Sequence, residues 1–161
     1  MTNLNDYLPY LMRRMLARIA DGIAPELADI GINHERWRVL TVLHQLGALP
    51  LNELANHVSI NTSTLSRLID RMIREELIDR APSGVGRAVA ISLAAKGEEK
   101  LEAITPMVES ISDVALNELG EEGVERLRSD LRRLYDAFDH YAADRAAYTN
   151  ARFKKPLSPA G

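Results

Sequence analysis

Residues 51–70 read LNELANHVSINTSTLSRLID, a pattern that fits two short helices joined by a tight turn. Two helices that cross steeply need apolar residues where they face each other and a small residue where their backbones meet. Counted from Leu51, the required apolar positions are Leu54, Val58, Ile60, Leu65 and Leu68, and the small residue is Ala55. The ninth position usually holds a glycine in a left-handed conformation, and here it is Ser59. This spacing predicts a helix-turn-helix.

The second of these helices is predicted to expose hydroxyl groups and arginines. Small hydroxyls near a helix N-terminus suit phosphates and base edges, and arginines one or two turns later reach guanine or the DNA backbone. An ordinary pair of packed helices would explain the apolar positions but would more often expose mixed Glu and Lys. We therefore expect DNA contacts from Asn61, Thr62, Ser63, Ser66, Arg67, Arg71 and Arg74.

A β-hairpin is predicted directly after the helix-turn-helix. Residues 78–81 read as a short strand, and residues 87–93 alternate with Val89, Ile91 and Leu93 on one face. The loop between them is rich in proline and glycine. A hairpin beside a recognition helix can reach the adjacent minor groove, which attracts arginine. This wing contributes Ser83, Gly86 and Arg87 as further expected DNA contacts.

The stretch from Leu51 to Gly97, LNELANHVSINTSTLSRLIDRMIREELIDRAPSGVGRAVAISLAAKG, resembles the winged helix-turn-helix core of the MarR (multiple-antibiotic-resistance regulator) family. With its flanking helices the resemblance covers about residues 5–145. It implies a homodimer whose N-terminal and C-terminal helices interlock and whose two lobes bind a pseudo-palindromic operator in double-stranded DNA. The family wing commonly reads Asp-Arg-Arg-Ala, whereas this chain has Val85-Gly86-Arg87-Ala88, so only Arg87 carries over. The acidic residue that usually helps to hold that arginine is absent, and Asp70 is a candidate substitute.

The expected fold is mainly α with a small β-hairpin: a winged helix-turn-helix lobe plus a helical dimerisation region. Apolar stripes at helical spacing fill the first thirty residues and two long C-terminal segments. We expect residues 1–30 and 98–147 to form the dimerisation region, residues 31–97 the DNA-binding lobe, and residues 148–161 a loose tail.

Composition excludes several classes of function. The 161 residues include no cysteine, which rules out disulfides, thiol redox switches and cysteine-containing zinc sites. The chain has no apolar run of membrane-spanning length and no targeting pattern, so a soluble cytoplasmic protein is expected. The four histidines are scattered, and the chain has neither a Gly-rich phosphate loop nor a clustered nucleophile and base. We therefore expect no metal site, no cofactor and no enzymatic activity.

The resemblance also implies a repressor that is released from DNA by a small ligand, often an aromatic acid or phenol. A pocket for such an anion needs cations and an apolar wall. The candidates are Arg14, Arg18, Trp37 and Arg38. A second interpretation places Trp37 in the core and pairs the arginines with acidic groups of the partner helix. For the whole chain, the alternative function is a winged-helix protein-interaction module that does not bind DNA.

Overall fold

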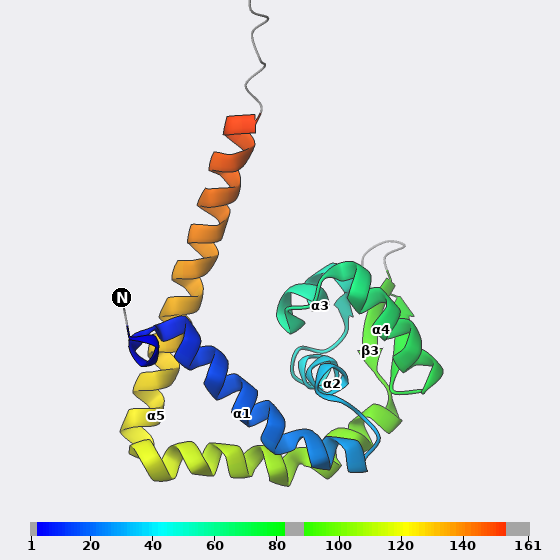
Figure 1. Ribbon diagram of the computed structural model, residues 1–161. Helices are drawn as coiled ribbons and strands as arrows, with labels where there is room; N and C mark the ends of the chain where they lie inside the picture. The colour runs from blue at the N-terminus through cyan, green and yellow to red at the C-terminus, as the bar shows by residue number, and fades with distance from the viewer. Residues whose placement is uncertain (1–2, 83–88, 154–161) are drawn as a thin grey trace, which may run out of the picture. The chain divides into compact units, whose positions relative to one another are not determined.

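The structure, a computed structural model, describes residues 3–82 and 89–153 and divides into two compact units (Figure 1). The first unit is Met1–Ile111 and the second is Ser112–Gly161. The first unit begins with one 3-10 turn, Leu4–Asp6. It continues with α1 (Leu8–Asp29), α2 (His34–Leu46), β1 (Leu49–Pro50), α3 (Leu51–Val58), α4 (Thr62–Arg74), β2 (Ile78–Pro82), β3 (Val89–Leu93) and the first part of α5 (Ala95–Phe153). None of the helices described is long and apolar enough to cross a membrane.

Local capping signals account for the ends of the helices in the first unit. Helix α2 begins after Asn33, whose side-chain oxygen accepts a hydrogen bond from the Arg36 amide at 3.0 Å. It ends at Gly47, where φ is 77°. Helix α1 ends just before Gly31, where φ is 74°. The helix expected within the first thirty residues is therefore confirmed.

The β-structure is larger than the predicted hairpin. Strands β2 and β3 pair antiparallel in a register that joins Ile78 to Leu93. Strand β1 adds a third, antiparallel strand on the other side of β3, with Leu49 opposite Ile91, so the strand order is β1-β3-β2. The pattern did not show β1 because two residues are too few for an alternation, and Pro50 indicated only the end of a helix.

One apolar core holds the first unit together. Helix α4 buries Leu65, Leu68, Ile69 and Met72 toward this core, whereas its other face is exposed. The same cluster includes residues from α1, α2, the sheet and α5: Ile23, Leu27, Val39, Leu40, Leu43, Ile78, Ile91, Leu101 and Ile104. Burial of these side chains fixes the orientation of α4 within the first unit, because its apolar stripe is only one face wide.

The first turn of α5 approaches the sheet too closely for any side chain. A Cβ atom at Gly97 would lie 2.2 Å from the Leu77 carbonyl oxygen and 2.8 Å from Leu93 Cδ1. The Leu77 carbonyl also accepts a hydrogen bond from the Ala94 amide at 3.2 Å. Gly97 therefore permits the backbone contact that attaches α5 to the lobe.

The second unit consists of the rest of α5. At Gly120 φ is 66° and ψ is 170°, which is not helical, so two helical segments follow one another as the sequence pattern predicts. The helix continues through residues 148–153, which the sequence pattern assigned to the tail. Alanines at 146, 147 and 151 favour helix there, and the first strong helix breaker is Pro156. Residues 154–161 lie outside the described part of the chain.

Candidate nucleic-acid interface

The N-terminus of α4 is built by a capping residue and a left-handed turn. Asn61 Oδ1 accepts hydrogen bonds from the Thr64 amide at 2.9 Å and from the Ser63 hydroxyl at 2.8 Å. Ser59, which ends α3, has φ 52° and ψ 42°, the left-handed conformation expected at that position of the motif. The turn sets α4 across α3, and the cap leaves the first turn of α4 exposed to solvent.

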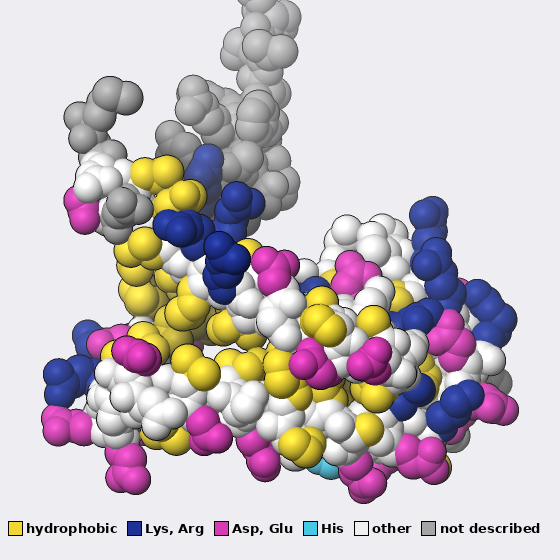
Figure 2. Space-filling model, turned by 60° about the horizontal axis from the view of Figure 1, so that its bottom comes forward, with side chains coloured by type: hydrophobic (Ala, Val, Ile, Leu, Met, Phe, Trp, Pro, Cys, Tyr) yellow, Lys and Arg dark blue, Asp and Glu magenta, His cyan; other side chains and the backbone are white. Residues whose placement is uncertain are grey.

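A basic stripe runs along the exposed face of α4. We define it as Ser63, Arg67, Arg71 and Arg74, which follow one another at intervals of four, four and three residues, so they share one side of the helix. All four residues are exposed, as is Thr62, while Ser66 is half-buried. The side chains of the three arginines form no ion pair or hydrogen bond with any residue in the described ranges. Figure 2 shows Lys and Arg side chains gathered on the right, the side on which Figure 1 places α4.

The acidic groups near the C-terminal half of α4 are paired with cations outside the basic stripe. Arg36 of α2 lies 2.6 Å from the Glu75 carboxylate, and Lys96 lies 3.5 Å from that of Glu76. Arg80 of β2 lies 2.8 Å from the Asp70 carboxylate. These pairs neutralise three carboxylates, so the positive charge of the basic stripe is not cancelled locally.

The pair between Asp70 and Arg80 connects the recognition helix to the first strand of the wing. Sequence reasoning considered Asp70 as a support for Arg87 and overlooked Arg80. Alternation along β2 could have identified Arg80 as the partner of Asp70. Arg80 stands two residues after Ile78, which is buried, so the two side chains lie on the same face of the strand. The expected wing contacts Ser83, Gly86 and Arg87 lie outside the described residues.

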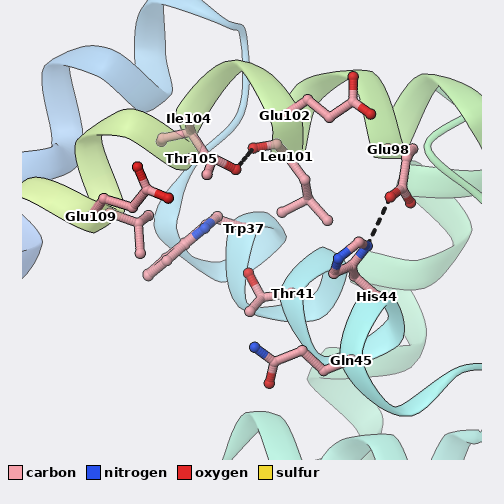
Figure 3. A pocket seen from close by; sticks show the side chains of 11 residues that line it. Trp37, Thr41, His44, Gln45, Glu98, Leu101, Glu102, Ile104, Thr105 and Glu109 are labelled. Carbon is pink, nitrogen blue, oxygen red and sulfur yellow. Dashed lines mark hydrogen bonds and ion pairs between the residues drawn. The ribbon is translucent and has the colours of Figure 1, made fainter. Parts of the chain in front are cut away.

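A cavity of about 340 Å³ lies between α2 and the first part of α5 (Figure 3). Of the four residues expected in a ligand pocket, Trp37 lines it and Arg14, Arg18 and Arg38 do not. Arg14 and Arg18 are exposed on α1, where Arg14 lies over the Tyr10 ring at 5.5 Å from its centroid. Arg38 is half-buried, and its Nε atom has no hydrogen-bond partner among the described residues. The structure therefore does not bring these four residues together around one cavity.

Comparison with known proteins identifies the fold and a family that the chain resembles. The MarR family model matches residues 32–84, which contain the helix-turn-helix and the first strand of the wing. The transcriptional repressor IacR of Pseudomonas putida is 26% identical over 131 residues, which are 81% of this chain and 78% of that protein. These matches show that the chain is similar to the MarR family. The chain is a DNA-binding transcriptional regulator of the MarR type, and the proteins it resembles are regulators and not enzymes.

Solved structures agree with the similarity to the MarR family. A MarR family transcriptional regulator from Silicibacter pomeroyi is 28% identical, with a TM-score of 0.71 over 86% of this chain and 91% of that one. MepR of S. aureus, solved as a complex with DNA, is 22% identical, with a TM-score of 0.74 over 84% of this chain and 99% of that one. At that identity the MepR structure supports the winged-helix fold alone. The predicted fold class, mainly α with a small antiparallel sheet, is therefore confirmed.

Proposed function

We propose that this MarR-type regulator is a cytoplasmic homodimer that represses a nearby operon and is released from its operator by a small ligand. The observation that carries the DNA-binding part is the unpaired basic stripe of α4. A positive stripe beside a helix N-terminus can contact phosphates and base edges in a major groove. IacR, a relative over most of the chain, is named a repressor, which supports the direction of regulation.

Exposed apolar surface supports the homodimer. In the first unit, the N-terminal half of α1 exposes Leu8, Leu11, Met15 and Leu16. In the second unit, α5 exposes Leu127, Tyr135, Phe138 and Tyr141, with Tyr135 at 70% exposure. A monomer rarely leaves this much apolar surface in water, and a twofold dimer would cover it. We assign residues 1–30 and 98–147 to dimerisation and residues 31–97 to DNA binding.

Within the DNA-binding lobe we propose separate roles for the recognition helix and the wing. Arg67 stands one turn after Ser63, where its guanidinium can reach a base edge. Asn61, Thr62, Ser63, Ser66, Arg71 and Arg74 supply the remaining contacts from α4. Ser83, Gly86 and Arg87 form the wing contact, and Arg87 reads the width of the minor groove at the flanks.

The test is DNA binding by matched arginine variants. DNA from upstream of the coding sequence is titrated with the wild-type protein, Arg67→Ala and Arg133→Ala. Arg133 is 80% exposed on α5, so its loss removes the same charge outside α4. We expect Arg67→Ala to lose about 1–3 kcal/mol, roughly 5- to 150-fold, and to relax preference at one base position of each half-site. Arg133→Ala, once sedimentation shows that it dimerises like the wild type, is expected to bind DNA like the wild type.

Two outcomes would contradict this proposal. Equal losses in the two variants would show that α4 has no special part in recognition. Absence of binding to any duplex by the folded wild-type protein would favour the protein-interaction module.

A further inference from the structure

The cavity between α2 and α5 has the size and the walls of a small-molecule site. Its volume of about 340 Å³ falls in the lower part of the range for ligand pockets. Leu101, Ile104 and Val108 of α5 form an apolar side, and Trp37 of α2 faces them. Figure 3 shows the Trp37 ring turned toward α5, with Thr41 and His44 following it along α2. An aromatic ring of a ligand can therefore lie between an indole and aliphatic side chains.

The charges around this cavity are negative. Glu98, Glu102 and Glu109 line it, and no Lys or Arg is among its described lining residues. The Glu98 carboxylate pairs with His44, with 2.8 Å between Glu98 Oε1 and His44 Nδ1. The carboxylates of Glu102 and Glu109 have no ion pair or hydrogen bond with any described residue. In Figure 3 the Glu109 carboxylate lies at the Trp37 end of the cavity, whereas the Glu102 carboxylate is turned away from Trp37.

We propose that this cavity binds a small aromatic ammonium compound and not an aromatic acid. The aromatic ring packs between Trp37 and the apolar side, and the ammonium group is held by the Glu109 carboxylate. The Trp37 face adds attraction for a cation and repels an anion. An anionic ligand beside Trp37 would meet the Glu109 carboxylate, with no Lys or Arg among the described lining residues to compensate. This inference rests on the proposed function: the small ligand that releases the protein from its operator is here a cation.

Trp37 itself allows a direct measurement, because it is the only tryptophan in the chain. Its fluorescence is recorded while the DNA-free protein is titrated with three compounds of similar shape: 2-phenylethylammonium, 2-phenylethanol and 3-phenylpropanoate. We expect the cation to saturate the signal at a concentration at least about tenfold lower than either of the others. Equal or tighter binding of the neutral compound or of the anion would overturn the proposal.

Charge-neutral variants locate the ammonium group. Glu109→Gln is expected to weaken cation binding at least about fivefold and to leave binding of 2-phenylethanol unchanged. Glu121→Gln, at an exposed position in the second unit, is the matched control and is expected to bind the cation normally. Arg38→Ala removes one of the cations that the sequence suggested for an aromatic acid, and we expect this variant to retain cation binding. Circular dichroism confirms that each variant is folded, and unchanged cation affinity in folded Glu109→Gln would overturn the assignment.

A second readout separates this inference from the proposed function. The complex with operator DNA is challenged with 2-phenylethylammonium at saturating concentration. Cation binding without release of DNA would refute the effector role while the cavity assignment stands. Normal DNA binding by a protein whose Trp37 signal does not respond to the cation would refute the cavity assignment alone.

Discussion

Ser59 is a residue whose backbone conformation does not suit its side chain. Its φ of 52° and ψ of 42° are disfavoured for any residue with a Cβ atom and accessible to glycine. We expect Ser59→Gly to raise the free energy of unfolding by up to about 1 kcal/mol, measured by urea denaturation. Ser66→Gly is the matched control, because it makes the same chemical change inside α4. It is expected to lower the stability by about 0.5–1 kcal/mol, and a gain there would contradict the backbone explanation.

His34, at the start of α2, is a residue whose environment disfavours its charged form. Burial and the nearby Arg38 guanidinium lower its pKa from the usual 6.5, against a smaller opposite effect of Glu35. As the pH falls below about 6.5, the unfolded chain takes up this proton more readily than the folded one, so stability decreases. The decrease is complete below the lowered pKa of the folded state, and above pH 7 the contribution is constant.

We expect His34→Gln to flatten the dependence of stability on pH between pH 5 and 7, measured by urea unfolding at several pH values. His57→Gln, at an exposed position of α3, is the control for replacing a histidine as such. A slope that His34→Gln leaves unchanged would show that His34 is not its source.

At the scale of the element, the N-terminus of α4 combines a structural role with a functional one. Asn61 caps the helix, and its side chain stands at the end that faces DNA in the proposed complex. Asn61→Asp keeps a capping oxygen and places a negative charge at a helix N-terminus, which is favourable. The same charge is repelled by DNA phosphates. We therefore expect unchanged or slightly higher stability with clearly weaker DNA binding, measured by urea unfolding and by operator titration.

Asn33→Asp is the matched control for the α4 cap. It makes the identical change at the cap of α2, which lies outside the proposed contacts. Equal losses of DNA affinity in both variants would indicate a general charge effect and contradict the assignment of the α4 N-terminus to the interface.

At the scale of the whole molecule, the net charge of the chain opposes DNA binding while the basic stripe favours it. The formal net charge is −3, so attraction to DNA depends on a few local contacts. If the arginines of both subunits neutralise 6–10 phosphates, affinity is expected to fall about 10³- to 10⁵-fold between 50 and 200 mM salt. Titration of one operator across this range measures the slope. A nearly flat response would show that the arginines of α4 do not meet phosphates.

The proposed dimer is tested by a charge placed on the exposed apolar face of the second unit. Phe138 is 58% exposed, so Phe138→Asp would change the stability of a monomer by no more than about 0.5 kcal/mol. In a dimer it would bury an unpaired charge, and we expect dissociation in sedimentation experiments. Asp139→Asn, a neighbouring exposed site, is the control. A wild-type protein that sediments as a folded monomer at micromolar concentration would contradict the dimer.

The helix-turn-helix and its polar face could be predicted from residues alone because both depend on contacts between neighbours in the chain. Apolar spacing and the left-handed position of Ser59 act over a few residues, and the structure confirms both of them. Tertiary structure decided the features that join distant segments. Strand β1 is recognisable only by its pairing with β3, and Gly97 is required only because the Leu77 carbonyl approaches it. Packing also brings α2 and α5 together, so that Trp37 and carboxylates of α5 line one cavity. Local sequence does not specify which faces of the two helices meet.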